Sequence, residues 1–167
     1  METIKEILQE ANSPAVGVAQ EIYDAGVKYK IDPAIALAFF AQESQYGTAS
    51  NWAGRANYQC GPEGSLNFGN IAVLDEDTLG HFCENFGGQQ CSGNRFCKYP
   101  SWGEGVRAWY VLLAEGKRYI SVGKNTVEKI IPVYCPATEC DVSGYIANVR
   151  SFVSEYRDRE SNKPKNT

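Results

Sequence analysis

The feature that most constrains this chain is an almost wholly apolar segment, residues 33–47, that carries one carboxylate near its end. The segment reads PAIALAFFAQESQYG, and none of residues 34–41 is charged. Asp32-Pro33 predicts a helix start, with Asp as the N-cap and Pro at the first helical position. Gly47 is a natural stop. A helix without a polar face is buried on all sides, so the chain must fold around it.

The carboxylate of this segment is Glu43, which lies one helical turn beyond Phe39. It therefore falls on a face that apolar side chains occupy. Loss of hydration raises the pKa of a carboxylic acid there, and the negative end of the helix dipole has the same effect. A raised pKa is what a general acid working near neutral pH requires. The alternative interpretation is a helix-terminal glutamate that faces solvent.

Four stretches of the chain, in order, carry a resemblance to a known superfamily. The first is the Asp-Pro start, the apolar helix and the run QESQYGT. The others are NFGNI at 67–71, YPSWGEG at 99–105 before an apolar helix, and IIPVYCP at 130–136 followed by Tyr145-Ile146. Together they resemble the lysozyme-like superfamily, and are most similar to the endo-β-N-acetylglucosaminidases of glycoside hydrolase family 73. Lytic transglycosylases and goose-type lysozymes share the Glu-Ser helix.

The resemblance implies an α+β fold, mainly α, of the lysozyme-like type, with a small β-hairpin or irregular β region. We expect a single glycosidase domain over residues 1–160 and a frayed, charged tail at 161–167. Helical periodicity and caps predict helices at 4–11, 13–29, 33–46 and 106–114, a helix capped at Asn125 that Pro132 bends or ends, and a last helix from Asp141. The β region is expected at 67–74, and a short helix at 77–82.

The resemblance also implies an activity, the cleavage of peptidoglycan strands at N-acetylglucosamine, with Glu43 protonating the glycosidic oxygen. No cofactor or metal is required, and the enzyme is expected to be a monomer. The residues implied to bind substrate are Ser44, Tyr46, Phe68, Asn70, Tyr134 and Tyr145. Gly69 would let a ligand approach the main chain closely. The structural alternatives are a helix cap for Ser44, turn chemistry for the NFGN run, and core packing for the tyrosines.

A second catalytic carboxylate stays unassigned at this point. The candidates are Glu63, Asp75, Glu76, Asp77, Glu84 and Glu104, of which Glu104 fits a capping box. Some members of the superfamily need none, because the substrate's acetamido group or its own 6-hydroxyl attacks instead. Two other functions remain open: a muramidase or lytic transglycosylase, and a non-catalytic wall-binding or phage structural module.

Charge excludes some partners. Asp and Glu outnumber Lys and Arg by 20 to 16, for a net charge of −4, which argues against nucleic acid as a ligand. Because the net charge is negative, an anionic wall polymer would be held by stacking and hydrogen bonds rather than by bulk charge. A membrane is not expected as a partner either, because no apolar run approaches the roughly 18 residues of a membrane span.

Cysteine usage indicates an oxidising compartment. The chain has 6 cysteines and 1 histidine, without the spacing of a zinc site. Disulfides are expected to tie the central loops and the Cys135–Cys140 turn, although six cysteines allow about 15 pairings. Free buried thiols are the alternative. Because disulfides form in oxidising compartments, an extracellular, cell-wall or phage-associated location is the expectation, although no hydrophobic signal-peptide core is visible at the start. The cytosol of a thermophile that tolerates disulfides is the alternative.

Overall fold

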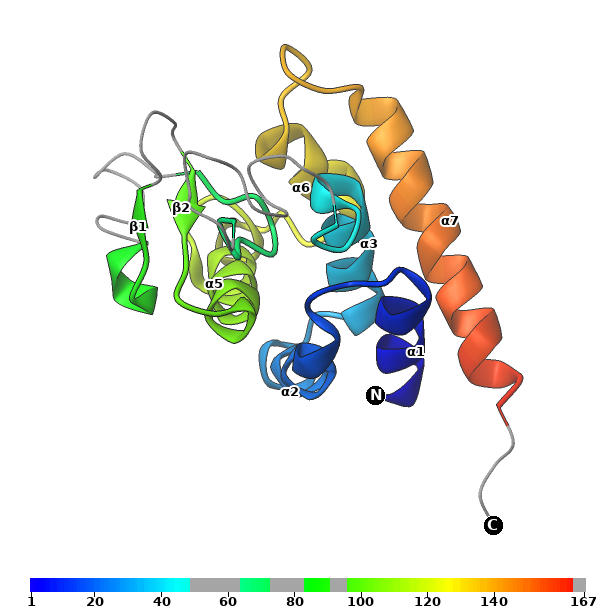
Figure 1. Ribbon diagram of the computed structural model, residues 1–167. Coiled ribbons are helices and arrows are strands. Elements are labelled where there is room, and N and C mark those ends of the chain that lie inside the picture. The colour runs from blue at the N-terminus through cyan, green and yellow to red at the C-terminus, as the bar shows by residue number, and fades with distance from the viewer. Residues whose placement is uncertain (49–63, 73–82, 91–95, 164–167) are drawn as a thin grey trace.

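In its described residues the chain is mainly helical, with a small two-stranded antiparallel sheet (Figure 1). The computed structural model describes residues 1–48, 64–72, 83–90 and 96–163. The helix expected at 77–82, and Glu63 and residues 75–77 among the candidate second carboxylates, lie outside the described residues.

Most elements are helices, and they are arranged around a central one. Their order is α1 (Glu2–Glu10), η1 (Val16–Val18), α2 (Ala19–Tyr29), α3 (Pro33–Ser44), η2 (Glu84–Phe86), β1 (Gln89–Gln90), β2 (Cys97–Lys98), α5 (Trp102–Glu115), η3 (Ile120–Val122), α6 (Val127–Tyr134) and α7 (Val142–Ser161). Figure 1 shows α3 in the middle, with α7 along one side and α5 with the sheet toward the other.

The apolar helix α3 is buried almost all round, as its sequence predicts. Residues 36–40 are each at most 4% exposed. Its two adjacent phenylalanines face different neighbours: Phe39 contacts Trp109 of α5, whereas Phe40 contacts Phe68 and Trp102. The described buried apolar side chains form one core around this helix.

The start of α3 is confirmed, but its end comes earlier than expected. Asp32 accepts a hydrogen bond from the backbone N–H of Ala34 at 2.9 Å, as an N-cap does. The helix ends at Ser44 rather than at residue 46. Gln45 and Tyr46 already adopt left-handed backbone conformations, with φ of 50° and 57°. The amide N–H of Tyr46 bonds back to the carbonyl of Phe40, which closes the helix before Gly47 is reached.

The regular β structure lies later in the chain than expected. The strands are β1 and β2, paired with Gln89 opposite Lys98. The segment predicted to be a hairpin, 67–74, contributes a single bridge from Ala72 to Phe96 in its described part. It is held instead by side-chain hydrogen bonds, which sequence periodicity does not report.

Two disulfides are present among the described cysteines. Cys83 is bonded to Cys97, which ties η2 to β2. The expected Cys135–Cys140 bridge is confirmed and closes the turn between α6 and α7. Cys60 and Cys91 lie outside the described residues. Within the described ranges, none of the helices is both long and apolar enough to cross a membrane.

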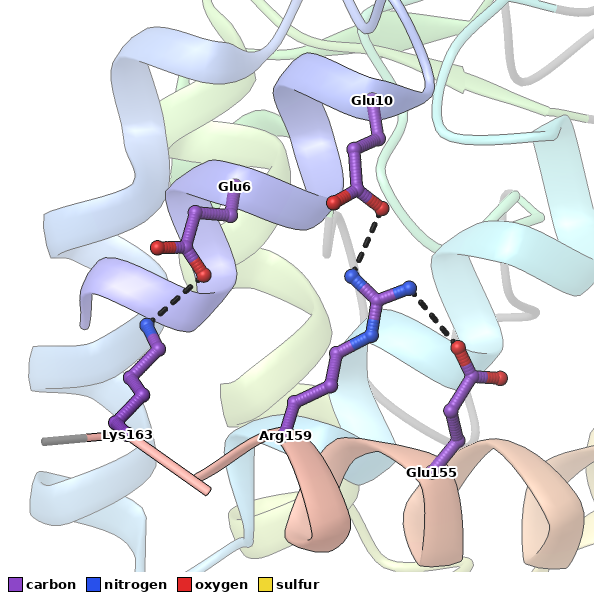
Figure 2. A network of polar contacts seen from close by, with 5 residues as sticks. All are labelled: Glu6, Glu10, Glu155, Arg159 and Lys163. Carbon is purple, nitrogen blue, oxygen red and sulfur yellow. Dashed lines mark hydrogen bonds and ion pairs between the residues drawn. The ribbon is translucent and has the colours of Figure 1, made fainter. Parts of the chain in front are cut away.

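The last helix begins where the sequence predicts, since Asp141 caps it through the N–H of Gly144. The expectation of a frayed tail from residue 161 is wrong for its first part, because α7 is fastened to α1 (Figure 2). Arg159 pairs with Glu10 at 2.8 Å, and Lys163 pairs with Glu6 at 2.9 Å. Acidic side chains on α1 thus face basic ones on and just after α7. Ion pairs near the surface of this kind contribute only about 0–1 kcal/mol each.

Candidate active site

Glu43 lies in the last turn of α3, where its partly buried carboxylate meets side chains from two distant parts of the chain. The hydroxyl of Tyr145, on α7, donates to Oε1 at 2.7 Å. The Nδ2 amide of Asn70 donates to Oε2 at 3.3 Å. Each carboxylate oxygen therefore has a donor that fixes its orientation, and both bonds favour the ionised form.

Burial nevertheless dominates the acidity of this group. It raises the pKa of Glu43 from 4.5 to about 7, although the hydrogen bonds from Tyr145 and Asn70 lower it. Loss of hydration penalises the charged form more than the two hydrogen bonds stabilise it. Glu43 is accordingly about half protonated near neutral pH, which suits a proton donor.

The apolar surroundings of Glu43 come from an aromatic cluster under it. Phe39, one turn earlier on α3, contacts Trp109, Tyr134 and Tyr145, with ring centroids 5.3, 5.0 and 5.3 Å away. These three rings come from α5, α6 and α7. The environment that sets the acidity of Glu43 is therefore assembled by the whole helical core.

Asn70 is positioned by a second asparagine that the sequence interpretation did not single out. Asn67 is fully buried; its Nδ2 donates to the carbonyls of Ile71 at 2.9 Å and of Cys97 at 3.0 Å. Its Oδ1 accepts from the N–H of Ile71 at 2.8 Å. These bonds hold the loop against β2 and present Asn70, whose φ of 52° is a conformation that Asn tolerates well. The two asparagines of the NFGN run, three residues apart, are the sequence feature from which the role of Asn67 could be predicted.

Gly69 serves the packing of this loop rather than the close approach of a ligand. A Cβ atom at this position would lie 2.0 Å from Cδ1 of Trp109 and 2.6 Å from the hydroxyl of Tyr134. The Tyr134 hydroxyl donates to the carbonyl of Gly69. The glycine thus lets the loop lie directly on α5 and α6, which corrects the reason expected for it.

A pocket of about 490 Å³ opens beside Glu43. A second cavity of about 310 Å³ also has Glu43 in its wall, together with Gln42, Asp141, Tyr145 and Asn148. Glu43 thus lines two cavities. The larger pocket is lined by Glu43, Asn70, Ile71, Ala72, Phe96, Leu112, Arg118, Tyr119, Val133, Tyr134, Cys135, Pro136 and Glu139.

Four polar or aromatic side chains of this lining were missed from the sequence: Phe96, Arg118, Tyr119 and Glu139. Glu139 lies in the turn that the Cys135–Cys140 disulfide closes, and its N–H bonds to the carbonyl of Pro136 at 2.8 Å. Arg118 and Tyr119 follow α5 in a run that resembles ordinary surface sequence. Burial raises the pKa of Tyr119 to about 12, so its hydroxyl stays protonated and can donate hydrogen bonds.

The structure brings some predicted binding residues to Glu43 and places others elsewhere. Asn70, Tyr134 and Tyr145 surround it. Ser44 is 1% exposed, donates to the carbonyl of Phe40 and accepts from the N–H of Gly47, so it caps the helix end instead of facing a ligand. This corrects its predicted role.

Phe68 and Tyr46 also need correction as substrate contacts. The Phe68 ring is fully buried, 4.3 Å from the ring of Phe40, because the loop turns it into the core. Tyr46 contacts Phe152 and lines a separate cavity with Arg159, away from the lining of both Glu43 cavities. Its left-handed backbone directs it there. The remaining described candidates for a second carboxylate, Glu84 and Glu104, are likewise absent from the linings of the Glu43 cavities.

Comparisons with models of known protein families, with curated proteins and with solved structures found no match to this chain. Within the described ranges, no group of three or more His, Cys, Asp or Glu side chains is arranged to hold a metal ion.

Proposed function

We propose that this protein is a glycoside hydrolase of the lysozyme-like type that cuts peptidoglycan strands at N-acetylglucosamine. The observation that carries the proposal is the pKa of Glu43, raised to about 7 by burial in a wall that two cavities share. A carboxylic acid that is still protonated near neutral pH, beside an open pocket, is what leaving-group protonation needs.

In the proposed reaction, Glu43 transfers its proton to the glycosidic oxygen as the bond to the anomeric carbon breaks. The carboxylate that forms keeps the hydrogen bonds from Tyr145 and Asn70, which stabilise it once it is charged. These two hydrogen bonds therefore favour the loss of the proton from Glu43. If the acetamido group attacks first, Glu43 takes a proton back from the water that later opens the cyclic intermediate. If Glu139 activates the water instead, Glu139 takes that proton and Glu43 is reprotonated from solvent.

Asn70 supports recognition of an N-acetyl sugar. With its amide oriented so that Nδ2 donates to Glu43, its Oδ1 is buried and lacks a partner among the described residues. A buried acceptor without a donor is unfavourable by about 1–3 kcal/mol. The N–H of an acetamido group could satisfy it after a small movement of the loop.

The attacking group on the opposite face of the sugar has two candidates. The acetamido oxygen of the substrate would give a product with retained anomeric configuration, whereas a water activated by Glu139 would give inversion. Proton NMR of the first anomer released distinguishes the two routes.

The test of the function is Glu43→Gln, with Glu21→Gln on α2 as a matched control away from the pocket. We expect Glu43→Gln to lose turnover of purified peptidoglycan by at least about 100-fold while still binding glycan, because it has no proton to donate. Glu21→Gln should retain wild-type turnover. Mass spectrometry of the products should show reducing N-acetylglucosamine ends.

Other outcomes identify the alternatives. Reducing muramic acid ends would indicate a muramidase, and 1,6-anhydro ends a lytic transglycosylase. Equal wall clearance by wild type and Glu43→Gln would contradict the catalytic role of Glu43 and favour a non-catalytic wall-binding module. The two disulfides support an oxidising location such as the cell exterior.

A further inference from the structure

Arg118 lines the Glu43 pocket. It follows α5 and is partly buried, and among the described residues it is the sole Lys or Arg side chain in the pocket lining. The protein as a whole is acidic, with a net charge of −4. The pocket therefore holds a positively charged group in a protein whose net charge is negative.

The other arginines in the described part of the chain all have carboxylate partners. Each forms at least one ion pair with an N–O distance between 2.7 and 3.5 Å: Arg107 with Glu104, Arg150 with Glu128, Arg157 with Asp32, and Arg159 with Glu10 and Glu155. Arg118 forms no ion pair or hydrogen bond with any described carboxylate. It differs from them in facing the pocket.

Among the described residues, none of the groups that line the pocket forms an ion pair with Arg118. Tyr119 is protonated, since burial raises its pKa to about 12 although the charge of Arg118 lowers it. Glu43, with a pKa of about 7, is neutral in the state that donates a proton. Glu139 lines the same pocket but lies beyond ion-pair distance of Arg118.

A partly desolvated guanidinium gains most from a planar anion. Its fixed fork of N–H donors matches the two oxygens of a carboxylate, which a lysine ammonium does not. Such charge-assisted hydrogen bonds are stronger than those of an exposed surface pair.

We propose that Arg118 binds a carboxylate of the glycan and makes the enzyme prefer acidic strands over neutral N-acetylglucosamine polymers. This inference rests on the proposed glycosidase function. In peptidoglycan the carboxylate belongs to the lactyl ether of muramic acid, where the peptide is absent, or to the peptide stem. Both sources present the same chemistry to the guanidinium.

The experiment compares cleavage of three substrates by wild type, Arg118→Gln and Arg118→Lys. The substrates are peptide-free peptidoglycan strands, strands with intact stems, and neutral chitohexaose. Arg150→Gln, which loses an exposed ion pair on α7, is the matched control. We expect Arg118→Gln to lose about 10–100-fold in kcat/KM on the acidic strands and less than about 3-fold on chitohexaose, because only the acidic strands lose an ion pair.

The pattern of losses separates the sources of the carboxylate. A loss on peptide-free strands identifies the lactyl group, and a loss confined to strands with stems identifies the stem; either supports the proposal. We expect Arg118→Lys to recover part of the rate and Arg150→Gln to match wild type. An equal loss on acidic and neutral substrates, or none on any, would overturn the role of Arg118.

A binding measurement keeps this test apart from the test of catalysis. The Kd of peptide-free strands is measured by calorimetry for Glu43→Gln and for the double variant Glu43→Gln/Arg118→Gln. Weaker binding by the double variant supports carboxylate recognition even if wild type cleaves nothing, in which case the proposed function alone fails. Equal binding by both overturns the inference and leaves the function standing.

Discussion

The hydroxyl of Tyr145 donates a 2.7 Å hydrogen bond to Oε1 of Glu43 across 102 residues of sequence. The bond joins the middle of the core, α3, to the helix α7 that runs along its side (Figure 1). It lowers the pKa of Glu43 against the larger effect of burial. The acidity of the proposed proton donor therefore depends on how α7 is docked.

Replacing Tyr145 by Phe should shift the pH dependence of activity upward. The hydroxyl stabilises the carboxylate form, so its removal raises the pKa of Glu43 above about 7. The alkaline limb of kcat/KM against pH should then move up by roughly 0.4–1.1 pH units, the equivalent of one hydrogen bond. The measurement is the pH profile on peptidoglycan.

Tyr110→Phe is the control for this variant. Tyr110 also donates a buried hydrogen bond, to the carbonyl of Ile22, but it is not part of the Glu43 site. It should lose stability without moving the alkaline limb. An unchanged limb in Tyr145→Phe would show that this hydroxyl does not control the acid.

Glu43→Gln should stabilise the protein at alkaline pH. Because the pKa of Glu43 in the folded protein, about 7, lies above its ordinary value of 4.5, the neutral form favours the folded state. This contribution to the free energy of unfolding is fully present below about pH 4.5 and is lost as the pH rises toward 7. Above pH 7 the loss amounts to about 3 kcal/mol. Gln does not ionise and avoids this loss.

The check is urea unfolding of wild type and Glu43→Gln at pH 4.5, 6 and 8. The two proteins should be of similar stability at the lowest pH, and the variant should gain progressively at the higher ones. A difference that does not vary with pH would mean that Glu43 ionises in the folded protein as it does in the unfolded chain.

Gly69→Ala should destabilise the loop that carries Asn70. The added Cβ would lie 2.0 Å from Cδ1 of Trp109, a ring that is fully buried and has little room to move. Overpacking of this kind is unfavourable by about 1–3 kcal/mol, which corresponds to a fall in Tm of roughly 2–12 °C.

Gly17→Ala is the matched control, since nothing lies within 4 Å of a Cβ at that position. Its Tm should change little in differential scanning calorimetry. If Gly69→Ala also unfolded at the wild-type temperature, the close contact between the loop and Trp109 would be disproved.

The sequence by itself determined what depends on near neighbours along the chain. The caps at Asp32 and Asp141 and the bridge of the Cys135–Cys140 turn follow from residues within a few positions of one another. The uninterrupted apolar run required a buried α3, and its spacing placed Glu43 above Phe39. These features are local, so one stretch of sequence is enough to predict them.

The tertiary structure alone decided which distant side chains meet at Glu43. Asn70 and Tyr145 lie 27 and 102 residues away, and Arg118 is brought to the same pocket by the turn after α5. The same packing turned Phe68 into the core. Contacts of this kind arise from the docking of helices and loops onto one another, and no periodicity in the sequence encodes them.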